Sequence, residues 1–124
     1  MLPTLEAVRT VERHVEKAWK GHIHRHRDYI SEPQETGYQA IHFVVERHER
    51  LIEVQVRTNR QNIWAQLNES LSRQAGAELK WGDGPEDIKE FLRELGEGLA
   101  VLDRGEVLSA AQRNVIAEAA HRVE

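Results

Sequence analysis

The strict alternation of apolar and polar residues between positions 41 and 57 most constrains the fold of this chain. Residues 52–57 alternate with the period of a half-buried β-strand, which separates Ile52, Val54 and Val56 from Glu53, Gln55 and Arg57. Residues 41–46 alternate in the same way and separate Ile41, Phe43 and Val45 from His42, Val44 and Glu46. The four residues between these segments are all charged or imidazole and predict a hairpin loop, although no Asn-Gly or Asp-Gly marks a tight turn. We therefore expect two adjacent strands with one apolar face and one polar face.

The polar face has two interpretations. It can be the solvated side of an antiparallel sheet, or it can be a functional surface. The loop before the first strand favours the second interpretation, because Gly37 and Tyr38 follow Pro33 and lead into the strand that bears His42. A glycine beside an aromatic residue at such a junction suits close backbone approach and a planar stacking surface. The alternative is a tyrosine that packs over the sheet edge.

A helix and a third strand are predicted before this region. Thr4 can cap a helix that Pro3 helps to start and Gly21 ends, with an apolar stripe formed by Val8, Val11, Val15, Ala18 and Trp19. Residues 22–28 then predict a strand in which His22, His24 and His26 alternate and share one face. Imidazoles at this spacing can bind a metal ion, and a solvated or phosphate-facing strand is the commoner alternative.

Three further helices are predicted after the strands. A capping box at residues 58–61 opens the first, whose apolar side comprises Ile63, Trp64, Leu67 and Leu71. Pro85 begins the second and Gly105 ends it, with Ile88, Phe91, Leu92, Leu95, Leu99 and Leu102 facing inward. A capping box at residues 109–112 opens the third, with Val115, Ile116 and Ala119 on its apolar side. The whole pattern predicts an α+β fold: a small, mostly antiparallel sheet flanked by helices, with a helical C-terminal part.

Composition limits the class of protein. The 124 residues suggest a single domain, 1–124, and the net charge of −4 argues against a bulk nucleic-acid binder. The absence of cysteine excludes disulfides and thiolate zinc sites. No apolar run approaches membrane length and no signal-peptide pattern precedes Pro3, so we expect no membrane partner and a cytoplasmic location. Without a glycine-rich phosphate loop, any bound phosphate would need side-chain cations.

The same stretch resembles a known family. The motifs D-Y-I, a following Pro, G-Y-Q-A-I-H, E-V-Q-V-R-T and W-A-Q-L are similar in order and spacing to those of the RelA/SpoT nucleotidyltransferase domain, the (p)ppGpp synthetase. The resemblance covers about residues 8–81, with the family's later helices continuing to about residue 103 within the helical part, residues 85–123. It implies a nucleotidyltransferase-like fold and an enzyme that transfers pyrophosphate from ATP to the 3′-hydroxyl of GDP or GTP with Mg²⁺, as in the stringent response.

The resemblance also implies roles for individual residues. Tyr38 would stack on the acceptor guanine, His42 would lie near the acceptor nucleotide, and Glu53 would be the essential carboxylate that works on the 3′-hydroxyl and the metal. Arg25, Arg27 and Arg57 are the available phosphate-binding cations, with solvated charges as the alternative, and Arg57 can instead orient Glu53 or Gln55. Gln34 occupies the acceptor-loop position that is often lysine in the family.

The chain departs from the family before Thr4, where nothing supplies the D-x-x-G-x-R strand, with its Mg²⁺-binding Asp, or the basic residues that grip ATP. We therefore expect an N-terminally truncated synthetase domain that is inactive on its own. An edge left without its neighbouring strand would favour a homo-oligomer. Two alternatives stay open: a non-catalytic nucleotide- or RNA-binding module, and a toxin-type relative that pyrophosphorylates a tRNA end or an adenine nucleotide. Nucleic acid is a partner only in these alternatives.

Overall fold

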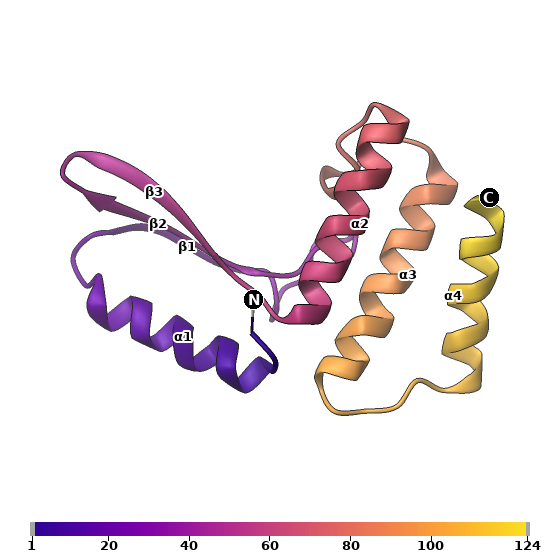
Figure 1. Cartoon of the computed structure of the whole chain (residues 1–124), viewed down its shortest axis with the longest axis horizontal. Helices are drawn as coiled ribbons and strands as arrows, with labels where there is room; N and C mark the ends of the chain where they lie inside the picture. Colours follow the sequence, from indigo (N-terminus) through magenta and orange to yellow (C-terminus); the bar gives the residue numbers. More distant parts are fainter. Residues whose placement is uncertain (1, 124) are drawn as a thin grey trace.

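Three antiparallel strands, β1 (Ile23–Asp28), β2 (Ile41–Arg47) and β3 (Arg50–Val56), form one sheet in the order β1-β2-β3. The computed structural model describes residues 2–123. Helix α1 (Leu5–Ala18) runs along one face of the sheet, and α2 (Asn59–Ala75), α3 (Glu86–Asp103) and α4 (Ala110–Val123) stand side by side at the end away from the hairpin turn (Figure 1). A short 3-10 helix, η1 (Leu79–Trp81), joins α2 to α3. The predicted α+β architecture is confirmed.

The register of the hairpin separates the two faces as the alternation predicts. His42 lies opposite Gln55 and Val44 opposite Glu53, whereas Phe43 lies opposite Val54 on the apolar face. Ile52 was predicted to lie on the apolar face and pairs with Val45 there, but it is 44% exposed. Within residues 2–123, β3 is an edge strand and no further strand covers its outer side.

The hairpin loop is tighter than its sequence suggests. Arg47 pairs with Arg50, so only His48 and Glu49 make the turn, with φ angles of 53° and 63°. Positive φ at both central residues is the signature of a type I′ turn, which usually contains Asn-Gly. Strand pairing holds two residues that are poorly suited to this conformation in place.

One hydrophobic core lies between α1 and the sheet. It contains Val8, Ile41, Phe43, Val45 and Val56, with Val11, Val15 and Trp19 packed against them. The predicted cap is present, because Thr4 Oγ1 accepts a hydrogen bond from the Ala7 amide at 3.0 Å. Ala18 was predicted to face inward and is exposed instead, since it is the last residue of α1.

A second core joins the start of β2 to the C-terminal helices. It comprises Tyr38, Ala40, Trp64, Leu79 and Leu92, and the Trp64 indole donates to the Leu92 carbonyl at 2.7 Å. The capping box of Thr58 and Gln61 that opens α2 is confirmed. The Thr58 hydroxyl also donates to Asp103 Oδ2 at 2.6 Å, so the start of α2 is tied to the end of α3.

Two predictions about apolar helix faces are wrong. Ile63 is 55% exposed and Val115 is 42% exposed. On α2, Trp64, Leu67 and Leu71 pack in the second core as predicted, but Asn62 and Asn68 are buried beside them and Ile63 is not. On α4 the inward contacts are made by Ile116, beside Gly98 of α3, and by the buried Ala119.

Among the described helices, none has the length and apolar character needed to span a membrane.

The three alternating histidines do not share a face, contrary to prediction. β1 begins after His22, and the register shifts between Ile23 and Arg25. His24 therefore contacts Glu46, with Nε2 3.4 Å from Oε2, whereas His26 stacks on Phe43 on the α1 side. The bulge breaks the period-two pattern on which the prediction rested.

Asp28 ties β1 to α1. Its Oδ1 accepts the amides of Ile30 and Ser31 at 3.0 and 2.9 Å, and its Oδ2 accepts Arg9 Nη1 at 2.7 Å. Burial alone would raise the pKa of this carboxyl, but the hydrogen bonds from Ser31, Arg9 and Ile30 outweigh burial and lower the pKa to about 2. Both carboxylate oxygens of Asp28 therefore already accept hydrogen bonds within the fold.

We predict that Asp28→Ala lowers the free energy of unfolding by about 1 kcal/mol, the usual cost of a lost capping side chain. Because the folded-state pKa is below the ordinary 3.8, Asp28 stabilises the fold above about pH 4 and loses this effect as the pH falls towards about 2. Urea unfolding of both proteins across this pH range measures the difference. Asp83→Ala is the matched control, because the Asp83 side chain is exposed. Equal stabilities of wild type and Asp28→Ala at pH 7 would contradict the prediction.

Candidate active site

A line of polar side chains crosses the sheet face opposite α1. The Tyr38 hydroxyl lies 2.5 Å from His42 Nε2, and His42 Nδ1 lies 3.6 Å from Glu53 Oε1. Gln55 Nε2 donates to the same Glu53 oxygen at 2.8 Å. The structure thus brings four of the predicted site residues together, and the β2–β3 register is what aligns three of them.

The electrostatics of this line favour a neutral imidazole. Burial lowers the pKa of His42; Glu53 opposes this effect, and Lys80, Arg25 and Arg57 add to it. Burial likewise raises the pKa of the Tyr38 hydroxyl, which stays protonated at neutral pH. A protonated phenol that donates to Nε2 leaves the proton of a neutral imidazole on Nδ1, facing Glu53. At 3.6 Å, Nδ1 is beyond hydrogen-bond distance of Glu53, and a neutral imidazole leaves the charge of the carboxylate in place.

Tyr38 is almost completely enclosed and is only 2% exposed. Its ring contacts Tyr29, Trp64 and Trp81, with centroids 6.0, 5.8 and 5.9 Å away. The Lys80 ammonium lies 5.0 Å from the centroid of the Tyr38 ring. In this structure, therefore, a lysine and a tryptophan lie against the predicted stacking residue.

A cavity of about 940 Å³ opens beside Tyr38. Gln55 and Arg57 line it from the sheet, and Asn68 and Lys80 line it from the helical side. Asn68 is buried and its Oδ1 has no hydrogen-bond partner within the part of the chain that the structure describes. The volume is within the range of ligand pockets, about 300–1,000 Å³, and a buried, unsatisfied carbonyl oxygen is a group that a ligand can satisfy.

Sequence reasoning missed Lys80 and Asn68. Lys80 lies in η1 beside the G-D-G-P turn, where no periodicity indicates which way a side chain points. Asn68 lies on a helix face that was assigned from apolar residues alone. The signal that could have found it is a polar residue four positions after Trp64, since residues four apart share a helix face.

The remaining predicted residues are distributed around this line. Arg27 pairs with His42 in the β1–β2 register and Arg25 pairs with Val44, so both belong to the site face. Gln34 lies apart: it lines a different cavity of about 870 Å³ between the acceptor loop (residues 29–40), α3 and α4. Its carbonyl accepts the Gly37 amide at 2.9 Å and shapes the turn before Tyr38.

Two glycines bring the acceptor loop against α3. Gly37 has a φ of +97°, and a Cβ there would lie 2.8 Å from the Leu92 carbonyl oxygen. A Cβ at Gly96 would lie 2.8 Å from the Gly37 oxygen and 2.9 Å from its Cα. The contact is backbone against backbone, so neither glycine can be replaced without moving the loop that carries Tyr38.

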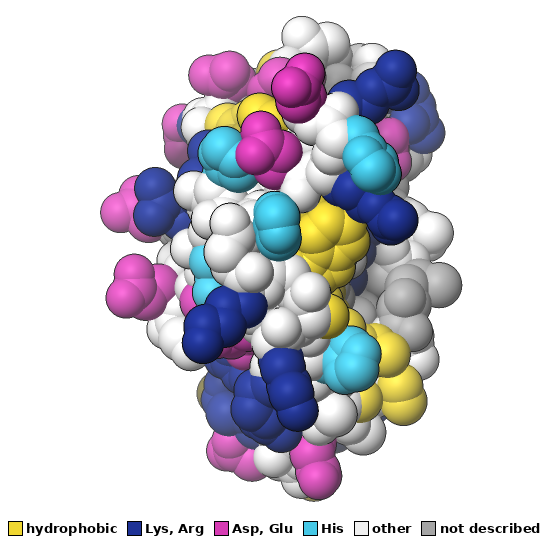
Figure 2. All heavy atoms as spheres, turned by 90° about the vertical axis from the view of Figure 1, so that its left-hand side faces the viewer, with side chains coloured by type: hydrophobic (Ala, Val, Ile, Leu, Met, Phe, Trp, Pro, Cys, Tyr) yellow, Lys and Arg dark blue, Asp and Glu magenta, His cyan; other side chains and the backbone are white. Residues whose placement is uncertain are grey.

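Viewed from the hairpin end, basic, acidic and histidine side chains are interspersed around a few apolar ones (Figure 2). A surface of mixed sign does not create the strong positive field that draws nucleic acid. The view therefore agrees with the low net charge of the sequence. The positive side chains relevant to the candidate site are those whose charge acts on His42, namely Arg25, Arg57 and Lys80.

Comparison with known proteins identifies the family of this chain. Residues 1–75 match the profile of the family described as "Region found in RelA / SpoT proteins". The chain belongs to this RelA/SpoT family, as its motifs predicted.

One curated relative is GTP pyrophosphokinase YjbM of Bacillus subtilis (strain 168), which is 36% identical over 99 residues, 68% of this chain and 44% of the relative. Among solved structures, the small alarmone synthetase 1 of Bacillus subtilis bound to its product pppGpp superposes with a TM-score of 0.69 and 28% identity, over 83% of this chain and 55% of that one. A GTP pyrophosphokinase family protein from Streptococcus pneumoniae superposes with a TM-score of 0.68 and 28% identity, over 94% of this chain and 60% of that one. The chain thus spans about half the length of these relatives.

We predict that Gly96→Ala destabilises the protein, because the new methyl group meets the Gly37 backbone and overpacking costs about 1–3 kcal/mol before any gain in helix propensity. Gly98→Ala is the matched control on the same helix, since its methyl group would meet only the flexible end of Ile116. Both substitutions gain about 1 kcal/mol of helix propensity, so Gly98→Ala should be neutral or stabilising. Denaturant unfolding compares them, and equal effects would contradict the role of the Gly37–Gly96 contact.

Proposed function

We propose that the chain forms the acceptor-binding part of a (p)ppGpp synthetase, which transfers pyrophosphate from ATP to the 3′-hydroxyl of GDP or GTP. The observation that carries the proposal is the line from Tyr38 through His42 to Glu53 beside a cavity of nucleotide size. Similarity to a protein named GTP pyrophosphokinase and to a synthetase bound to pppGpp supports it. A single domain over residues 1–124, a cytoplasmic location and a homo-oligomer stay predictions.

Glu53 is proposed as the group that acts on the 3′-hydroxyl. Its side chain is 53% exposed, so it can reach a nucleotide, and one of its oxygens is already held by Gln55. A carboxylate oriented in this way can accept the proton of an attacking hydroxyl. In pyrophosphoryl transfer, positioning and charge stabilisation do most of the catalysis, and Arg25, Arg57 and Lys80 supply positive charge around His42.

The donor chemistry at Glu53 also fits a Mg²⁺ ion, which takes oxygen ligands from one or two carboxylates, phosphates and water. On the same sheet face Glu46 is engaged by His24, and Asp28 lies on the opposite face, where it pairs with Ile41 and binds Arg9. Glu53 is therefore the residue that would hold the ion. When bound, the ion would neutralise charge on the transferring phosphates.

For a base to stack on Tyr38, the Lys80 ammonium has to leave the ring, because that ring is almost fully enclosed. A lysine side chain is flexible and moves at little cost, and its displaced ammonium is then available to an acceptor phosphate. Trp81 lies 5.9 Å from Tyr38 and is 52% exposed. It offers a second aromatic surface next to the same base position.

We predict that Tyr38→Ala weakens GDP binding by about 1–3 kcal/mol, the typical contribution of base–aromatic stacking. Tyr38→Phe is the matched control, because it keeps the ring and removes only the hydroxyl that contacts His42. Isothermal titration calorimetry of the three proteins, with their folding checked by circular dichroism, gives the affinities. Equal GDP affinity of Tyr38→Ala and wild type, or no GDP binding by the wild type, would remove the acceptor role of Tyr38.

We further predict that the 124-residue chain makes little (p)ppGpp and that a fusion supplying the family's D-x-x-G-x-R segment is active. Glu53→Gln in the fusion should abolish turnover, whereas Glu46→Gln, on the same sheet face but paired with His24, should preserve it. The assay uses radiolabelled ATP, GDP and Mg²⁺, with products separated by thin-layer chromatography.

Robust product from the 124-residue chain, or an active Glu53→Gln fusion, would contradict this assignment. If the fusion labels tRNA or an adenine nucleotide instead of GDP, the acceptor belongs to the toxin-type class. If wild type binds GDP and the fusion labels no acceptor, the chain is a nucleotide-binding module without chemistry.

A further inference from the structure

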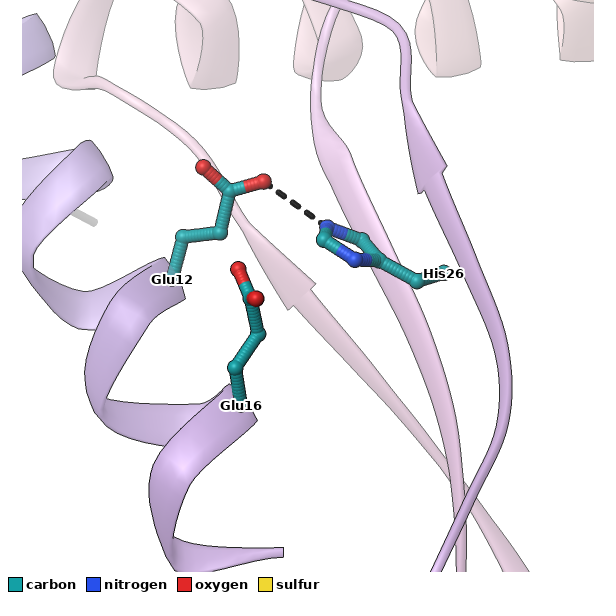
Figure 3. A group of neighbouring side chains, drawn as sticks. All are labelled: Glu12, Glu16 and His26. Atoms are coloured by element: carbon teal, nitrogen blue, oxygen red, sulfur yellow. Dashed lines mark hydrogen bonds and ion pairs between the residues drawn. The ribbon is translucent and has the colours of Figure 1, made fainter. Parts of the chain in front are cut away.

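A second group of ligand-type side chains lies on the opposite side of the sheet from Glu53. Helix α1 contributes Glu12 and Glu16, which are four residues apart and so project from the same helix face. Strand β1 contributes His26 (Figure 3). One ligand atom from each residue lies within 4.8 Å of the other two.

His26 and Glu12 are held in place by their neighbours. The His26 ring stacks on Phe43 with centroids 4.2 Å apart, and its Nε2 lies 2.8 Å from Glu12 Oε2. The other Glu12 oxygen accepts Arg9 Nη1 at 3.0 Å. Outer contacts of this kind orient the ligands of metal sites. Glu12 Oε2 and His26 Nε2 thus both face the space between the helix and the strand.

Glu16 distinguishes this cluster from a simple ion pair. The contact between Glu12 and His26 accounts for those two residues, but the Glu16 side chain makes no hydrogen bond or ion pair within residues 2–123. Its carboxylate nevertheless points toward the other two side chains (Figure 3). Glu16 is exposed, so it can rotate at little cost.

We propose that Glu12, Glu16 and His26 bind a divalent transition-metal ion of the zinc class. One imidazole nitrogen and two carboxylate oxygens suit Zn²⁺ and its neighbours, whereas Mg²⁺ prefers oxygen ligands alone. Three protein ligands leave one position of a tetrahedral ion to water. Ligands about 2.0–2.2 Å from such an ion lie about 3.4 Å apart. Binding would therefore move Glu12 and His26 slightly apart from their present 2.8 Å, and the exposed Glu16 side chain would turn in to complete the site.

The surrounding charge permits a cation here. Arg9 contacts the cluster through Glu12, but its charge is shared between Glu12 and Asp28, at 3.0 and 2.7 Å. The ion would replace the proton between His26 and Glu12 and would link α1 to β1. Because it binds the folded state, it would raise the stability of the protein. It would not take part in the pyrophosphoryl transfer, since His26 pairs with Phe43 on the core face and Glu53 lies on the other.

The test titrates the metal-free chain with Zn²⁺ by calorimetry and follows the unfolding temperature with Zn²⁺ or Mg²⁺. We expect one Zn²⁺ per chain, a higher unfolding temperature with Zn²⁺ than with Mg²⁺, and a visible absorption band when Co²⁺ replaces Zn²⁺. Glu16→Gln should weaken Zn²⁺ binding at least about ten-fold, since the loss of even an outer-shell partner costs about 10- to 100-fold. Because the Glu16 side chain is exposed, this substitution should leave folding intact.

Two more variants make the result specific. His26→Phe keeps an aromatic ring against Phe43 and removes the nitrogen ligand, so it should abolish the Zn²⁺ effect. His14→Gln removes an exposed histidine of the same helix outside the cluster and should bind Zn²⁺ like the wild type. The proposal is overturned if Glu16→Gln and His26→Phe bind as the wild type does, if His14→Gln loses binding equally, or if no stoichiometric binding occurs.

Discussion

The pairing register of β2 with β3 is the constraint on which the candidate site depends. It places His42 opposite Gln55 and brings Glu53 within 3.6 Å of the imidazole. A slip of one residue would carry Glu53 to the core face and an apolar side chain to the site, because side chains alternate along a strand. The buried face formed by Ile41, Phe43 and Val45 prevents that slip. Hydrophobic burial on one face thus fixes the chemistry on the other.

The helical part contributes to the site through close packing. α3 presents Gly96 to the acceptor loop and accepts the Trp64 indole at the Leu92 carbonyl. Together these contacts hold Tyr38 between the sheet and the helices. The predicted helices around residues 85–123 are therefore more than a cover for the core, because they position the residue proposed to bind the base.

The two faces of the sheet have different electrostatic environments. On the site face, buried His42 is held neutral, while Arg25, Arg57 and Lys80 surround it with positive charge suited to phosphates. On the α1 side, next to the hydrophobic core, the carboxylates of Glu12 and Asp28 share one guanidinium, Arg9. The same strand, β1, serves both faces, since Arg25 and Arg27 project to one side and His26 to the other.

The sequence by itself determined the family through its motifs, and the three strands and the helix caps through alternation and capping boxes, which are local signals. The same motifs predicted Tyr38, His42 and Glu53 as site residues, and the structure places these three side chains in one line. Only the tertiary structure decided that Asn62 and Asn68 of α2 are buried, that the bulge in β1 separates His24 from His26, and that Lys80 lies against Tyr38. These features depend on contacts between segments far apart in the chain, which no local pattern records. The contact between Gly37 and Gly96 is the clearest case: 59 positions separate two glycines, and only their packing shows why neither can carry a side chain.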